Sequence, residues 1–184
     1  MIIRELDISD VFEIIPEPKR DDRGFFMRVY DHELFDERGI GYTWIQENHS
    51  RTVKKGVIRG LHFQLPPSSE TKLVRCVRGA VYDVAVDLRK GSATFGQWIA
   101  RELTEENMKM LLIPKGFAHG FCSLTGLSEV IYKVDAPYSP EQERGILWND
   151  DDLNILWPAA DPLLSDKDRK NMTLKEYLRE IKKG

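Results

Sequence analysis

The chain has 184 residues, of which 41% are hydrophobic and 31% are charged. It carries 27 Lys and Arg against 30 Asp and Glu, so it lacks the basic surplus typical of proteins that bind nucleic-acid polymers. No stretch of about 18 consecutive apolar residues predicts a membrane span, so we expect one globular domain over residues 1–184, with neither nucleic acid nor membrane as a partner.

A short helix is predicted first, over residues 31–38, between the N-cap residue Asp31 and the stop residue Gly39. The segments that follow are short, rich in Val, Ile and aromatic residues, and bounded by Gly, Pro, Ser or Asn, which predicts strands. They are residues 56–64, 71–78, 80–89, 97–103, 110–113, 128–134 and 145–148. Many short strands predict a mostly β sandwich or small barrel, and no Gly-rich phosphate loop of a Rossmann or P-loop domain is present.

The last predicted element is a helix over residues 173–183. Thr173 and Glu176 have the spacing of a capping box, and apolar residues follow at helical spacing. We expect this helix to pack on the β domain without taking part in chemistry.

Two of the four histidines lie in unusual segments. His62 follows Arg59-Gly-Leu in a predicted strand, and His119 lies among glycines and aromatic residues. A lone His is most often structural, but Arg59 and Lys72 nearby favour a polar site. The alternative is an ordinary solvated strand face with alternating charges.

Metal and nucleophile motifs are missing from the sequence. The His-x-His pair of many metal-binding β-barrels is absent at His62, and His62 with His119 does not fill a metal shell, so we expect no metal. Cys76 and Cys122 form no Cys-x-x-Cys or activating motif, and the first residues carry charges where a secretory signal needs an apolar run. These features predict a reduced, cytoplasmic protein whose site works by acid–base chemistry.

Nine motifs in order over residues 10–169 resemble the dTDP-4-dehydrorhamnose 3,5-epimerase family. They are DRGFF (22–26), QENHS (46–50), VIRGLHFQ (57–64), KLVR (72–75), DVAVDLR (83–89), TFGQW (94–98), IPKGFAHGF (113–121), WND (148–150) and LSDKD (164–168). The resemblance implies a cupin-type jelly roll without metal or cofactor. It also implies a homodimer whose subunits exchange N-terminal strands.

The resemblance also implies a reaction. Members invert C3 and C5 of dTDP-4-dehydro-6-deoxy-glucose, because the C4 ketone acidifies the protons on both carbons. His62 matches the base and Asp168 the carboxylate that orients it. Tyr132 matches the proton donor on the other face of the sugar, and Lys72 the group that stabilises the enolate oxygen.

Other matches imply residues that hold the substrate. Arg23, Arg59 and His119 are cationic or donor groups for the diphosphate and sugar. The remaining matched positions are Gln46, Asn48, Glu143 and Lys167, with Asp83 as a polar residue lining the pocket.

Two positions depart from the family pattern, and one spacing conflicts with strand geometry. Arg28 stands where an acidic residue that contacts the nucleotide is common, and Glu47 where Asp is usual. Arg28 either alters the nucleotide or sugar preference or, as we favour, pairs with a local carboxylate. Strict alternation puts Arg59 and His62 on opposite faces of a strand, so either Gly60 bends the strand or Arg59 serves a neighbouring subunit.

Three alternatives to the full 3,5-epimerase remain open. The enzyme could invert C3 only or C5 only, or act on another nucleotide-linked 4-keto sugar. A ketoisomerase is a further enzymatic alternative. The alternative from a different class is a non-catalytic cupin that binds a sugar nucleotide.

Overall fold

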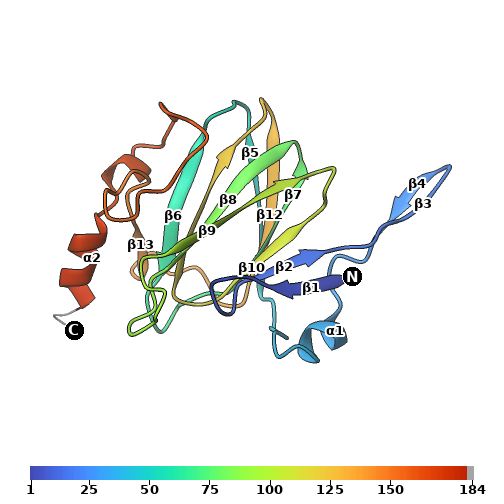
Figure 1. The fold of residues 1–184 in the computed structure, drawn as a ribbon, viewed down its shortest axis with the longest axis horizontal. Coiled ribbons are helices and arrows are strands. Elements are labelled where there is room, and N and C mark those ends of the chain that lie inside the picture. The colour runs from blue at the N-terminus through green and yellow to red at the C-terminus, as the bar shows by residue number, and fades with distance from the viewer. Residues whose placement is uncertain (182–184) are drawn as a thin grey trace.

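The computed structural model describes residues 1–181. They form two antiparallel sheets that face each other, with one short helix after the first four strands and another at the end of the described residues (Figure 1). The six-stranded sheet has the order β1 (Ile2–Glu5), β2 (Phe12–Ile15), β10 (Met110–Ile113), β7 (Lys72–Arg78), β12 (Ser128–Val134), β5 (Gln46–Thr52). The five-stranded sheet has the order β13 (Glu143–Gly145), β6 (Ile58–Gln64), β11 (Phe117–Ser123), β8 (Ala80–Asp87), β9 (Trp98–Thr104). The predicted mostly β sandwich is therefore confirmed.

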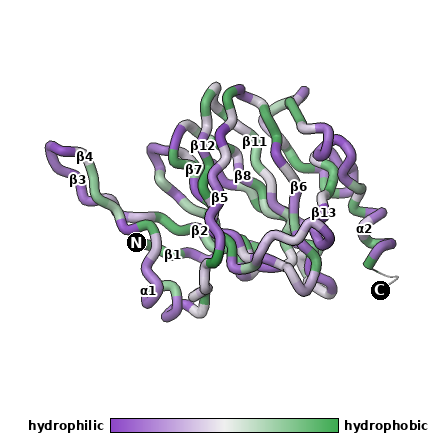
Figure 2. Tube along the Cα trace, turned by 180° about the vertical axis from the view of Figure 1, so that it is seen from behind, coloured by the Kyte–Doolittle hydropathy of each residue, from purple (hydrophilic) through white to green (hydrophobic). Residues whose placement is uncertain are grey.

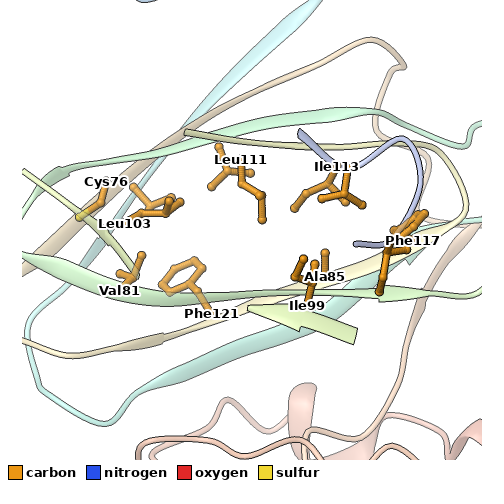
Figure 3. Close-up of a cluster of buried hydrophobic side chains, with 13 residues drawn as sticks. Cys76, Val81, Ala85, Ile99, Leu103, Leu111, Ile113, Phe117 and Phe121 are labelled. Carbon is orange, nitrogen blue, oxygen red and sulfur yellow. The ribbon is translucent and has the colours of Figure 1, made fainter. Parts of the chain in front are cut away.

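The main core lies between the two sheets. Leu111 and Ile113 from β10 face Val81, Ala85 and other residues of the five-stranded sheet, and all of them are buried (Figure 3). Side chains alternate along β8, so Val84 points to the opposite face of the sheet from Val81 and Ala85. There it packs in a second buried cluster that includes residues of the C-terminal helix. Both faces of β8 are thus covered, which holds the central strands rigidly.

Both predicted helices are present. In α1 (His32–Asp36), the Asp31 side chain accepts a hydrogen bond from the Leu34 N–H, and Gly39 adopts a φ of +70°. In α2 (Leu174–Ile181), Thr173 and Glu176 exchange the two hydrogen bonds of a capping box. The end of the predicted helix, at residues 182 and 183, lies outside the described residues. None of the helices described is long and apolar enough to cross a membrane.

Several strands differ from prediction. The strand predicted at residues 145–148 is wrong, because β13 ends at Gly145 and Leu147 bonds instead to Met172. β1, β2, β5 and β11 were not predicted as strands. β3 (Lys19–Asp21) and β4 (Gly24–Phe26), also unpredicted, form a hairpin that projects from the body as an arm (Figure 1).

Asp87 organises the loop after β8. Its buried carboxylate accepts hydrogen bonds from the Arg89 guanidinium at 2.9 and 3.0 Å and from the Ser92 and Thr94 hydroxyls at 2.6 Å. Burial alone raises the pKa of Asp87, but these hydrogen bonds outweigh it and lower the pKa from its ordinary 3.8 to about 2. A carboxyl whose pKa is depressed by folding contributes stability above its unfolded pKa, and that contribution is lost as the pH falls through the folded value.

We therefore expect Asp87→Asn to lower the free energy of unfolding at pH 7 by about 2 kcal/mol. The difference between wild type and variant should narrow as the pH falls from about 4 to about 2, because the wild-type carboxyl then becomes protonated. Urea unfolding at several pH values and one fixed protein concentration measures this. A difference that stays constant over that range contradicts the role of the ionised carboxylate.

Candidate active site

A cavity of about 560 Å³ opens between the two sheets. β5, β7 and β12 of the six-stranded sheet line one wall, β6, β11 and β13 of the other sheet line the opposite wall, and residues 163–168 close one side. Most of the predicted site residues line it. They are Gln46, Asn48, Arg59, His62, Lys72, His119, Tyr132, Glu143, Lys167 and Asp168.

A bulge in β6 brings Arg59 and His62 to the same cavity. His62 pairs with His119 of β11 and Arg59 with Phe121, so β6 advances three residues while β11 advances two. Gly60, with a φ of +121°, lies in this stretch, and a Cβ there would lie 2.6 Å from the Gly120 Cα. Of the two alternatives for Arg59, the structure thus shows the bend at Gly60, which resolves the conflict with strict alternation.

His62 and Asp168 form a hydrogen-bonded pair. His62 Nε2 lies 2.5 Å from Asp168 Oδ1, and the His62 side chain is 30% exposed while that of Asp168 is 5% exposed. Burial by itself raises the pKa of Asp168, but the His62 ring, together with the Ser165 hydroxyl, outweighs it and lowers the pKa. An ionised carboxylate accepts the Nε2 proton, which leaves Nδ1 as the unprotonated, basic nitrogen of a neutral ring.

Tyr132 supplies a phenol from the opposite wall. It lies on β12 of the six-stranded sheet, whereas His62 lies on β6 of the other sheet. Burial, and then the charges of Glu70 and Glu143, raise the pKa of Tyr132. The phenol therefore keeps its proton at neutral pH and can donate it. A base on one wall and an acid on the other suit reactions that remove a proton from one face and return it to the other.

Lys72 places a buried ammonium between these walls. Its Nζ donates to the His62 carbonyl oxygen at 3.3 Å and lies 3.1 Å from Glu70 Oε1. Only 6% of Lys72 is exposed. A buried cation beside a basic imidazole can stabilise negative charge that develops on a bound substrate.

Charged and aromatic groups form the rim. Glu143 Oε2 accepts a hydrogen bond from the Tyr138 hydroxyl at 2.7 Å and lies 2.6 Å from Lys167 Nζ. Burial raises the pKa of Glu143, but Lys167 and Tyr138 outweigh it, so the pKa is lowered and the carboxylate is ionised. Gln46 accepts a hydrogen bond from the Tyr138 N–H at 2.9 Å. The rim is thus a connected polar network.

Comparison with known proteins decides the family. A family model described as dTDP-4-dehydrorhamnose 3,5-epimerase matches residues 5–176. This chain belongs to that family. The resemblance drawn from the nine motifs is therefore confirmed, and the chain is an epimerase-family enzyme.

Relatives of this epimerase family match over nearly the whole chain. A dTDP-4-dehydrorhamnose 3,5-epimerase from Shigella flexneri is 51% identical over 169 residues, which is 91% of this chain and 93% of the relative. A crystal structure of a Bacillus anthracis enzyme of that name, with TDP and PPi bound, is 46% identical with a TM-score of 0.92, covering 94% and 99% of the two chains. A Legionella pneumophila dTDP-6-deoxy-D-glucose-3,5-epimerase in complex with dTDP-4-keto-L-rhamnose is 41% identical with a TM-score of 0.90, covering 95% and 93%. These structures confirm the cupin-type fold.

Two residues expected in the epimerase site lie behind its walls. Asp83 was predicted to line the cavity but does not. It is fully buried on β8, with its two oxygens 2.9 and 3.1 Å from His119 Nε2. Asp83 lies on β8 beside β11 in the same sheet, has no exposed surface, and holds the His119 ring with its carboxylate instead. Glu47 pairs with Lys133 on the opposite face of β5 from Gln46, because side chains alternate along a strand.

Two further expected residues lie on the N-terminal arm and near α1. Arg23, at the turn of the β3–β4 arm, pairs with Asp21, and its side chain is 90% exposed. Arg28 pairs at 2.8 Å with Asp31, the N-cap of α1, as the favoured interpretation expected. Neither residue lines the cavity of its own chain.

Sequence reasoning missed several lining residues. Glu70 contacts Lys72, Gln64 contacts Glu70, and Ser165 accepts a hydrogen bond from the Asp168 backbone N–H. One signal was available, because Glu70 precedes Lys72 by two residues, which is the spacing of one strand face. Within residues 1–181, no group of three or more His, Cys, Asp or Glu side chains is arranged to hold a metal ion.

Proposed function

We propose that this chain converts dTDP-4-dehydro-6-deoxy-glucose into dTDP-4-dehydrorhamnose by inverting C3 and C5 in turn. The observation that carries the proposal is the pairing of His62–Asp168 on one wall with the Tyr132 phenol on the other. A base and an acid on opposite walls of one cavity fit inversion, which needs a proton removed from one face and another added to the opposite face.

The proposed steps balance at each carbon. His62 Nδ1 takes the proton from C3, the C–H electron pair forms a C3–C4 double bond, and the carbonyl pair moves onto the C4 oxygen. The Lys72 ammonium stabilises this enolate oxygen. The enolate then collapses back to the ketone as C3 takes the Tyr132 proton from the opposite face. The imidazolium releases its proton to water, the phenolate regains one, and the same pair acts at C5.

Asp168 supports the base in two ways. Its carboxylate fixes the His62 ring with Nε2 protonated, and its negative charge stabilises the imidazolium that forms on proton abstraction. The buried Asp83 plays a similar orienting part for His119, whose ring lies in the cavity wall and offers a donor to the substrate.

The polar rim suits a nucleotide sugar. Arg59, His119 and Lys167 provide cationic or donor groups for the diphosphate and the sugar, and Gln46 and Asn48 provide amides. Tyr138 is 57% exposed at the rim and is held by its hydroxyl, so its ring offers a flat apolar surface for the base.

A homodimer that completes each site with the N-terminal arm belongs to this proposal. The arm projects from its own chain, and its tip is hydrophilic next to a hydrophobic β4 stretch (Figures 1 and 2). Phe25 and Phe26 on the arm are 52% and 69% exposed, an apolar surface expected to be covered by a second copy. Arg23 at the tip is then available to the partner's diphosphate site.

We expect Arg23→Ala to raise KM about 10- to 100-fold, because a charge-assisted contact to a phosphate is lost. If Arg23 acts in the partner's site, coexpression of Arg23→Ala and His62→Ala chains produces sites with the wild-type KM, which neither variant shows alone. Random pairing makes half of the dimers mixed, each with one intact site, so about a quarter of all sites are intact. Steady-state kinetics of the mixture measures this, and no recovery contradicts the shared site.

The proposed activity is tested by following dTDP-4-dehydro-6-deoxy-glucose by NMR with the purified protein and a metal chelator. We expect conversion to the rhamno isomer, undiminished by the chelator, and slower conversion of UDP- and GDP-linked analogues. Conversion that stops after inversion of one carbon supports the single-carbon epimerase. Binding of the sugar nucleotide without conversion supports the non-catalytic cupin and contradicts the proposal.

A further inference from the structure

Glu70 is an acidic residue in the cavity to which the reaction steps above assign no part. It lies on the segment just before β7, lines the cavity, and has a side chain that is only 13% exposed. A carboxylate this buried is costly unless it is paired and hydrogen-bonded. Its partners therefore indicate what it does.

Both carboxylate oxygens of Glu70 are occupied. Oε1 lies 3.1 Å from Lys72 Nζ, and Oε2 accepts a hydrogen bond from Gln64 Nε2 at 3.1 Å. Gln64 is itself fixed, because its amide donates to the Ser68 carbonyl at 2.9 Å and its Oε1 accepts from the Ser139 N–H at 2.6 Å. Glu70 is thus held between the Gln64 amide and the Lys72 ammonium, and each of its oxygens already has a polar partner.

The Lys72 ammonium is also held in place by its contacts. Of its three N–H donors, one points to the His62 carbonyl oxygen and one to Glu70, which leaves one for the substrate. Lys72 shares the cavity with His62, which becomes cationic when it takes a proton, and two cations there repel each other. The negative charge of Glu70 offsets that repulsion.

We propose that Glu70 is a positioning residue, one that holds the Lys72 ammonium so that it is aimed at the enolate oxygen. This inference rests on the proposed epimerase function. The other titratable groups that line the cavity are Arg59, His62, His119, Tyr132, Tyr138, Glu143, Lys167 and Asp168. Glu70 is the one that touches Lys72 through its side chain.

A second consequence concerns the acid on the opposite wall. After burial, the charge of Glu70 is the largest of the influences that raise the pKa of Tyr132. The same carboxylate therefore favours a protonated Tyr132 and a charged Lys72, the two states that the proposed reaction requires.

The test uses Glu70→Gln, which keeps the shape of the side chain and removes its charge. We expect kcat to fall about 10- to 100-fold with a much smaller change in KM, because the enolate loses more stabilisation than the ground state. Glu70→Asp keeps the charge and should recover part of the loss.

A double variant tests whether Glu70 acts through Lys72. Lys72→Met alone removes the ammonium, so adding Glu70→Gln to it should cost little more in kcat. Asp152→Asn breaks an exposed ion pair with Lys175 and serves as the matched carboxylate-to-amide control, with unchanged kinetics expected.

The outcomes separate the two proposals. Wild-type protein that fails to convert the substrate contradicts the proposed function itself. If the wild type is active, a Glu70→Gln deficit that lies in KM and not in kcat, or one that adds in full to that of Lys72→Met, overturns the role of Glu70. A variant that loses activity only because it unfolds is recognised by thermal unfolding, and Glu70→Asp, which keeps the charge, then decides the question by whether it recovers kcat.

Discussion

His62→Ala is expected to abolish both inversion and exchange of solvent deuterium at C3 and at C5, with losses of about 10³-fold or more. One base serves both carbons, so both exchange reactions should disappear together. The reason lies in the geometry, because His62 lies in the cavity wall opposite Tyr132, with Nε2 2.5 Å from Asp168. NMR of the 4-keto sugar in heavy water measures each carbon separately.

Two companion variants make this result interpretable. His49→Ala changes a histidine outside the cavity that pairs with Glu129, and it should retain wild-type exchange. Asp168→Asn should reduce the rate but leave some exchange, because the imidazole remains and only its orientation and charge support are lost. If His62→Ala kept exchange at either carbon, another group would have to be the base there.

Tyr132→Phe is expected to separate exchange from inversion. Without the phenol, no acid delivers a proton from the opposite wall, so we expect inversion to fall about 10²- to 10³-fold. Deprotonation by His62 continues, and its 30% exposed ring can exchange its proton with water and return deuterium to the face it came from. Deuterium should therefore enter the substrate without change of configuration.

Tyr82→Phe is the matched control for this variant. Tyr82 packs against Trp157, away from the cavity, so the same chemical change there should leave both rates unaltered. Exchange and inversion that fall by the same factor in Tyr132→Phe would show a general binding or structural role and contradict the assignment of the proton donor.

The parts of the fold predicted well are those in which local pattern and burial agree. In β8, Val84 and Val81 point to opposite faces, and both faces are buried, so Val-rich alternation marks the strand clearly. The capping box at Thr173 fixes the start of α2 by hydrogen bonds within four residues. Such local determinants are visible in one sequence.

Two of the strands that were not predicted, β5 and β11, carry polar residues of the site in place of an apolar pattern. β5 reads QENHSRT because it lies at the edge of its sheet and lines the cavity with Gln46, Asn48 and Ser50. β11 contains His119 and Gly120, which suit close packing against β6 and not strand propensity. In both strands, the site overrides the residue preferences on which sequence reasoning depends.

The remaining features of the site could not be predicted, because they depend on contacts between residues far apart in the sequence. The motifs placed His62 and Asp168 in one site through the family resemblance, but the bulge that admits Arg59 depends on the register between β6 and β11. The family resemblance placed Asp83 in the cavity wall, but in the fold its carboxylate is buried against the His119 ring. Glu70 was overlooked because its meaning comes from Lys72 and Gln64, contacts that only the folded chain reveals.

The most direct test of the central claim is the incorporation of deuterium during turnover of dTDP-4-dehydro-6-deoxy-glucose in heavy water. The account predicts one deuteron at C3 and one at C5 of the rhamno product, with both centres inverted, and neither in the presence of the His62→Ala variant. Product that forms with no solvent deuterium at either carbon, or substrate that is bound and never exchanged, would contradict proton abstraction by His62 and return by Tyr132.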